Sequence, residues 1–135
     1  MLRSDILAKF QDRGVLPTAQ RIEVANVLLT KPQHLSAEQI IERLREENST
    51  VSKATVYNTL NLFTERGLIK ECLVDPERRF YDSTTEPHHH FYNADTGELS
   101  DIPMSAIELS GLPSLPEGTE LTGTELIVRI RNSAD

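Results

Sequence analysis

Three of the chain's four histidines are adjacent, at His88, His89 and His90. On a β-strand, side chains alternate between faces, so His88 and His90 would share one face and His89 the other. Two imidazoles arranged in this way can bind one metal ion, and Asp82 and Asp101 on flanking strands can add carboxylate oxygens. A mixed nitrogen and oxygen ligand set suits Fe(II), Mn(II) or Zn(II). The alternative interpretation is an exposed histidine tract, because a histidine-rich composition is weak evidence by itself.

A second group of residues, from Ser52 to Leu60, has the pattern of a DNA-contacting helix. The N-terminal residues of the second helix in a helix-turn-helix meet base edges in the major groove. Here the outward positions are small or polar, and they can contact phosphates, adenine or thymine methyl groups. Arg21 fits a phosphate contact and a plain surface charge equally well. The predicted DNA-binding set is Arg21, Ser52, Lys53, Ala54, Thr55, Tyr57 and Asn58. Two alternatives stay open: an ordinary amphipathic helix and a winged helix that binds protein.

The net charge of −7 argues against DNA binding only at first sight. Residues 1–75 hold 10 basic and 10 acidic side chains, whereas residues 76–135 hold 4 and 11. The second part therefore carries the whole excess of negative charge. Because electrostatic footprints are local, the first part can still present a basic face to DNA.

The elements that must position these residues begin with helices. Gly14 can end a first helix over residues 4–13, and a second is expected over residues 19–29. Ser36 and Gln39 form a capping-box pattern before a third helix, whose inner stripe is Ala37, Ile40, Ile41 and Leu44. A fourth helix is expected over residues 53–65, with Val56, Leu60 and Phe63 facing inward. Strands over residues 68–74 and 79–81 then complete a winged helix.

After Pro87 the pattern changes. A second hairpin is expected over residues 90–93 and 98–102, followed by a Pro- and Gly-rich stretch and a last strand over residues 124–131. The predicted class is α+β. The predicted domains are a winged-helix DNA-binding domain, residues 1–84, and a small α/β dimerisation and metal-sensing domain, residues 85–135.

Several protein classes are disfavoured by composition. A membrane helix needs roughly 18 or more apolar residues in a row, and the chain has no such run. The N-terminus lacks a secretory pattern. The single cysteine, Cys72, cannot form an internal disulfide and is expected to be a small buried apolar residue. These features favour a cytoplasmic protein. No catalytic residues and no enzyme activity are predicted.

Four stretches taken together, in their order and spacing, resemble the ferric uptake regulator (Fur) superfamily of bacterial metal-responsive repressors. They are Leu16–Arg21 (LPTAQR), His34–Ile40 (HLSAEQI), Ala54–Leu60 (ATVYNTL) and the histidine run.

The resemblance implies a homodimeric repressor that binds a double-stranded DNA operator, an A/T-rich palindrome. It further implies a regulatory metal shared by the two domains, with Fe(II) or Mn(II) held by three histidines and two carboxylates. Carried over residue by residue, these ligands are His34, Asp82, His88, His90 and Asp101.

This chain also departs from the family pattern. Asn93–Thr96 replaces the first of two Cys-x-x-Cys pairs and the C-terminus has no cysteine, so a structural tetrathiolate zinc is excluded. The Pro-rich C-terminus resembles the iron response regulator branch, which implies haem as a further cofactor at His88, His89 or His90. Sensing of metal level, of peroxide and of haem all stay open. A non-haem iron enzyme and a winged-helix protein-interaction module are the alternative functions.

Overall fold

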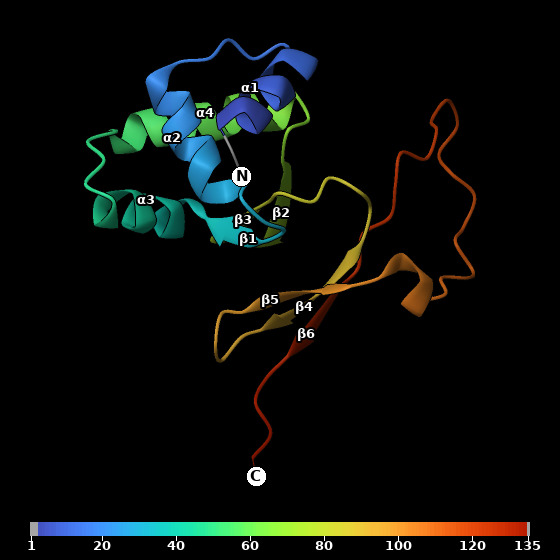
Figure 1. Ribbon diagram of the computed structural model, residues 1–135. Helices are drawn as coiled ribbons and strands as arrows, with labels where there is room; N and C mark the ends of the chain where they lie inside the picture. The colour runs from blue at the N-terminus through green and yellow to red at the C-terminus, as the bar shows by residue number, and fades with distance from the viewer. Residues whose placement is uncertain (1–2, 135) are drawn as a thin grey trace. The chain divides into compact units, whose positions relative to one another are not determined.

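The computed structural model describes residues 3–134, which form two compact units that divide between Thr85 and Glu86 (Figure 1). The first unit contains four helices: α1 (Arg3–Asp12), α2 (Ala19–Leu28), α3 (Ala37–Glu46) and α4 (Lys53–Glu65). The second unit is built on strands and contains one short 3-10 helix, η1 (Met104–Ala106). The predicted α+β class is confirmed.

Side-chain caps fix where the helices start. Ser36 accepts a hydrogen bond from the Gln39 backbone N–H, and the Gln39 side chain accepts one from the Ser36 backbone, so the predicted capping box is present. Thr18 caps α2 by accepting a hydrogen bond from the Arg21 backbone N–H, and Ser52 caps α4 by accepting one from the Thr55 backbone N–H. Gly14, which follows α1, has a φ of 68°, a left-handed conformation that glycine adopts without strain.

A three-stranded sheet completes the first unit, with the strand order β1-β3-β2. The strands are β1 (His34–Ser36), β2 (Lys70–Asp75) and β3 (Arg78–Asp82), and both pairings are antiparallel. The β2–β3 hairpin was predicted. Strand β1 was not, because three residues that pair with a strand more than forty positions later leave no local pattern.

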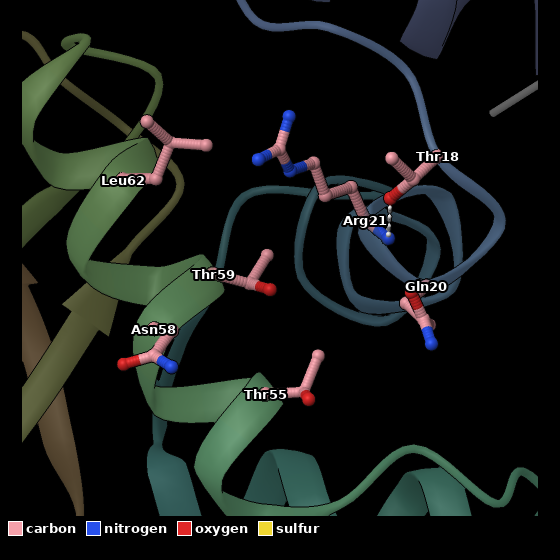
Figure 2. Close-up of a pocket in the computed structure, with 7 residues that line it drawn as sticks. All are labelled: Thr18, Gln20, Arg21, Thr55, Asn58, Thr59 and Leu62. Atoms are coloured by element: carbon pink, nitrogen blue, oxygen red, sulfur yellow. Dashed lines mark hydrogen bonds between the residues drawn. The ribbon is translucent and has the colours of Figure 1, made fainter.

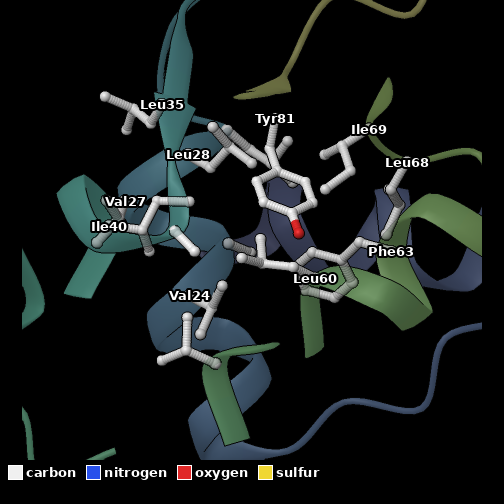
Figure 3. Packing of buried hydrophobic residues seen from close by; sticks show 14 of the residues in the cluster. Val24, Val27, Leu28, Leu35, Ile40, Leu60, Phe63, Leu68, Ile69 and Tyr81 are labelled. Carbon is white, nitrogen blue, oxygen red and sulfur yellow. The ribbon is translucent and has the colours of Figure 1, made fainter. Parts of the chain in front are cut away.

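The core of the first unit is apolar and continuous (Figure 3). The stripe predicted for α3 is buried, as are Val56, Leu60 and Phe63 on α4. The ring of Phe63 packs against Phe10 of α1, with 5.5 Å between ring centroids. Cys72 in β2 is buried, as expected. This core holds α4 in place while its polar side remains exposed.

The second unit is a three-stranded sheet with the order β5-β4-β6. Its strands are β4 (His89–Asn93), β5 (Leu99–Ile102) and β6 (Ile127–Ile130). Strand β4 is antiparallel to β5 and parallel to β6. The final strand is shorter than predicted. Its last residue, Ile130, is exposed although it is apolar. Among residues 3–134, no helix has both the length and the apolar character needed to cross a membrane.

Candidate metal centre and nucleic-acid interface

In the first unit, His34 and Asp82 lie directly opposite each other on β1 and β3. The His34 Nε2 atom is 3.4 Å from Asp82 Oδ2. The other oxygen of Asp82, Oδ1, accepts a hydrogen bond from the Thr84 backbone N–H at 2.8 Å. The hydrogen bond from Thr84 therefore orients the carboxylate so that its Oδ2 atom faces the His34 imidazole.

Strand β1 is held in this register by its neighbour Gln33. The Gln33 side-chain amide donates to the backbone oxygens of Val27 and Leu28 at the end of α2. Its backbone N–H donates to the Ser83 hydroxyl, and the Ser83 N–H donates back to the Gln33 carbonyl. These bonds tie both ends of the His34–Asp82 pair to the helical core.

In the second unit, His88, His90 and Asp101 form a compact cluster. Each offers one ligand atom within 4.8 Å of the others. His88 Nε2 and His90 Nε2 lie 3.2 Å and 3.5 Å from Asp101 Oδ1, and the two rings are 4.4 Å apart. The expectation that His88 and His90 share a face is confirmed. His90 pairs directly with Asp101 across β4 and β5, so the cluster repeats the cross-strand His–Asp arrangement of the first unit.

The His88 ring is oriented so that its Nε2 atom faces Asp101. Its Nδ1 lies 2.6 Å from the Glu86 carbonyl oxygen. A carbonyl only accepts, so Nδ1 carries a proton, and Nε2 is the nitrogen of this ring that could hold a metal ion. Metal-binding histidines commonly donate their second ring N–H to a carbonyl in this manner. The donor set fits Fe(II), Mn(II) or Zn(II).

His89 has a different role from its neighbours. It is buried, and its Nδ1 accepts a hydrogen bond from the Leu126 backbone N–H at 2.9 Å. In the neutral ring the proton is then on Nε2, which leaves neither nitrogen free to bind a metal. The structure therefore separates His89 from the other two haem candidates and makes it a link between β4 and the residue that precedes β6.

Sequence reasoning missed Glu125 at the cluster. Its Oε1 atom lies 3.8 Å from His90 Nδ1, on the ring edge opposite Asp101. A carboxylate behind a ligating imidazole orients the ring and raises its basicity. The contact depends on the parallel pairing of β6 with β4, for which the sequence has no local signal.

The predicted DNA-binding residues lie at the start and on the exposed side of α4, except Arg21, which belongs to α2. Lys53, Ala54, Tyr57 and Asn58 are exposed. Ser52 and Thr55 have a structural task in addition, because the Ser52 hydroxyl caps the helix and also bonds the Thr55 hydroxyl at 2.9 Å.

Arg21 meets two of these residues at a hollow between α2 and α4 (Figure 2). The guanidinium donates to the Leu16 carbonyl at 2.7 Å, which fixes one of its nitrogens and leaves its other N–H groups for a further acceptor. The hollow is lined by Thr18, Gln20, Arg21, Thr55, Asn58, Thr59 and Leu62.

Tyr57 does not line this hollow. It lines a second one, together with Glu38 of α3 and Arg79 of β3. Its hydroxyl donates to Glu38 Oε1 at 2.8 Å, and this bond raises the pKa of the Tyr57 phenol. Arg79 is paired with Glu71 on the neighbouring strand. The predicted DNA-binding set thus divides into an Arg21 group and a Tyr57 group.

Comparison with known proteins gives a consistent assignment. Residues 12–128 match the model of the Ferric uptake regulator family. The chain is 28% identical over 130 residues to the Ferric uptake regulation protein of Synechococcus elongatus, covering 93% of this chain and 88% of the relative. It is also 28% identical over 96 residues to the Peroxide-responsive repressor PerR of Staphylococcus aureus, covering 71% of this chain and 65% of that protein.

The fold has a counterpart among solved structures. The ferric uptake regulator of Pseudomonas aeruginosa with manganese superposes with a TM-score of 0.72 and 24% identity, and 98% of each chain is covered. At this identity the likeness shows a shared fold.

Proposed function

Since this chain belongs to the ferric uptake regulator family, a family of metal-responsive DNA-binding transcription regulators rather than enzymes, we propose that it is a metal-controlled repressor. In this proposal, one divalent ion takes ligands from both units and thereby controls the binding of the winged helix to duplex DNA. Regulators of this family act as dimers, and we assign dimerisation to residues 85–135. A cytoplasmic location and an A/T-rich palindromic operator are part of the proposal.

The observation that carries the proposal is the duplicated His–Asp arrangement. Each unit offers an imidazole Nε2 that faces a carboxylate oxygen across an antiparallel strand pair. His88 adds a third imidazole, with its proton held at Nδ1 by the Glu86 carbonyl. The proposed ligands are His34, Asp82, His88, His90 and Asp101.

The regulatory consequence follows from the distribution of these ligands. A metal ion that binds groups of both units stabilises the arrangements in which those groups converge. In this proposal, DNA binds the same arrangement of the two units that the metal stabilises. The metal can therefore raise the DNA affinity by as much as it binds that arrangement more tightly than the others. The donor set suits Fe(II) and Mn(II), with Zn(II) as a competitor.

The DNA side of the proposal rests on the Arg21 group and the exposed residues of α4. Arg21 and Lys53 supply positive charge for phosphates, which position the protein without selecting a sequence. Tyr57 and Asn58 project from the exposed side of α4 and are assigned to base edges. Thr55, Ser52 and Ala54 complete the surface that faces the groove.

The test compares His34→Ala with the unmodified chain in a titration of DNA with protein, with and without Mn(II). His34 is the histidine that the winged-helix unit contributes. We expect the variant to lose the stimulation of DNA binding by Mn(II) while remaining a dimer in sedimentation. Glu42→Ala, an exposed carboxylate of α3, is the matched control and should keep the stimulation. Undiminished stimulation in His34→Ala would refute a metal shared by the two units.

Repeating the DNA titration with Fe(II), with Fe(II) followed by peroxide, and with haem shows which of these three signals the protein senses. Metal sensing predicts stimulation by Fe(II) and Mn(II). Peroxide sensing predicts loss of DNA binding only when Fe(II) is bound, with added oxygen mass on a ligand such as His34 or His88. Haem sensing predicts release of DNA by haem alone, with His88 or His90 as the residue that binds haem.

A further inference from the structure

The side chain of Tyr57 is restrained by a residue of another helix. Tyr57 lies on the first half of α4 and is 39% exposed, so its ring is available to a ligand. Its hydroxyl donates a hydrogen bond of 2.8 Å to Oε1 of Glu38, nineteen residues earlier in the chain. Helix α4 therefore presents a tyrosine whose hydroxyl proton is already donated to Glu38.

Glu38 is well placed to hold the Tyr57 side chain. It is the second residue of α3, inside the first turn fixed by the Ser36–Gln39 capping box. Its own backbone N–H, and after it the Tyr57 hydroxyl, lower the pKa of the Glu38 carboxyl, which favours the ionised form that accepts the Tyr57 hydrogen bond. A carboxylate at a helix N-terminus is also favoured by the helix dipole.

The engaged proton restricts what Tyr57 can recognise. A phenol that donates to Glu38 cannot donate to guanine O6 or N7, and the adjacent carboxylate repels phosphate. The remaining options are an apolar contact of the ring with a thymine methyl and acceptance of a hydrogen bond from an exocyclic amino group.

We propose that Glu38 is a positioning residue for sequence recognition: by accepting the Tyr57 hydroxyl, it directs the ring to methyl- or amino-bearing base edges and excludes guanine acceptors and phosphates. This inference rests on the proposed DNA-binding function, and it assigns to α3 a part in specificity. Glu38 itself touches no DNA in this role.

Two substitutions of Glu38 separate positioning from charge. Glu38→Gln removes the negative charge but keeps an oxygen that can accept the Tyr57 hydroxyl, whereas Glu38→Ala removes both. The probe is a duplex enriched by the unmodified, Mn(II)-loaded protein from a randomised pool. The measured quantity is the ratio of affinity for this duplex to affinity for the unselected pool.

We expect Glu38→Gln to retain the ratio and Glu38→Ala to lower it roughly 5-fold or more, the size of one lost base preference. In a Tyr57→Phe background, Glu38→Ala should cause no further fall, because the hydroxyl through which Glu38 acts is gone. Selection with Glu38→Ala should admit guanine at the position contacted by Tyr57. Glu42→Ala on the same helix should leave the ratio unchanged.

Two results would overturn the role of Glu38 while leaving the proposed DNA-binding function intact. One is an equal affinity ratio in Glu38→Ala and Glu38→Gln. The other is an equal fall of the ratio on Glu38→Ala whether position 57 is Tyr or Phe. Failure of the unmodified protein to enrich any sequence would overturn the proposed DNA-binding function, and the inference with it.

Discussion

The two units use burial in different ways. The hydrophobic cluster lies entirely within residues 6–81 and is made of aliphatic and aromatic side chains from all four helices and the sheet. In the second unit the buried residues include as many imidazoles as apolar side chains: His88, His89, His90, Tyr92, Leu99 and Ile102. The first unit therefore has an extensive apolar core, whereas half of the buried residues of the second unit are imidazoles, two of which, His88 and His90, are proposed metal ligands.

Exposed apolar side chains reinforce this contrast. The second unit leaves a set of large apolar residues uncovered: Phe91, Met104, Leu109, Leu112, Leu115, Leu121 and Ile130. A segment of about 50 residues with so small an apolar core is marginally stable by itself. We infer that its stability comes from outside its own chain, from the partner protomer of the family's dimer and from bound metal.

The largest effect is expected in the core of the first unit. Phe63 is fully buried against Phe10, so Phe63→Ala should lower the free energy of unfolding by about 3–5 kcal/mol. Leu16→Ala, at a residue 76% exposed in the same unit, should change it by roughly 0.5 kcal/mol or less. Denaturant unfolding measures both. If Phe63→Ala changed the free energy of unfolding as little as Leu16→Ala does, the first unit would not depend on its apolar core in the way proposed.

The second effect concerns metal and should be largest in the second unit, which supplies three of the five proposed ligands, with a smaller effect at β1 and β3, which carry His34 and Asp82. At a hundredfold excess of Mn(II) over its dissociation constant, binding stabilises the native state by about 2.7 kcal/mol. Hydrogen exchange should show that this protection includes β4, β5 and β6, whereas the helical core, already stable, gains little.

The variant His90→Ala should abolish the protection because it removes a proposed ligand. Glu98→Gln, an exposed acidic residue of the same hairpin, should retain it. Equal protection of α1 and α4 by Mn(II) would show that the two units do not differ in their dependence on metal.

The same contrast explains what the sequence could predict. Helices of the first unit are determined by local features, such as the Ser36–Gln39 box and the Ser52 cap, and these were predicted and confirmed. The shared face of His88 and His90 was predicted from strand alternation, although His88 lies just before β4 and is oriented by its contacts with the Glu86 carbonyl and Asp101. Strand β1, the parallel β4–β6 pairing and the Glu125 contact depend on pairing between distant residues, which no local pattern encodes. The Tyr57–Glu38 bond was missed because it joins two helices whose crossing is set by the core.

The smallest effect is at the surface of the first unit, where the Tyr57–Glu38 bond should be visible in the titration of the phenol. The bond raises the pKa of Tyr57 above its ordinary value of about 10. The stabilisation from the bond is then fully present below that value and is lost as the pH rises through the raised pKa. Glu38 has a lowered pKa, so at the acid end the stabilisation is present above its ordinary value and is lost as the pH falls through the lowered one.

Ultraviolet difference titration of the unmodified chain against Tyr57→Phe isolates the Tyr57 tyrosinate from Tyr81 and Tyr92. We expect its midpoint to lie above the ordinary value and to move down in Glu38→Ala, because the largest cause of the raised pKa is the bond to Glu38. Glu42→Ala should leave the midpoint in place. An unshifted midpoint in Glu38→Ala would mean that the surface of the first unit is not held by this bond. The contrast between the two units would then rest on their buried residues alone, which are apolar in the first unit and include three imidazoles in the second.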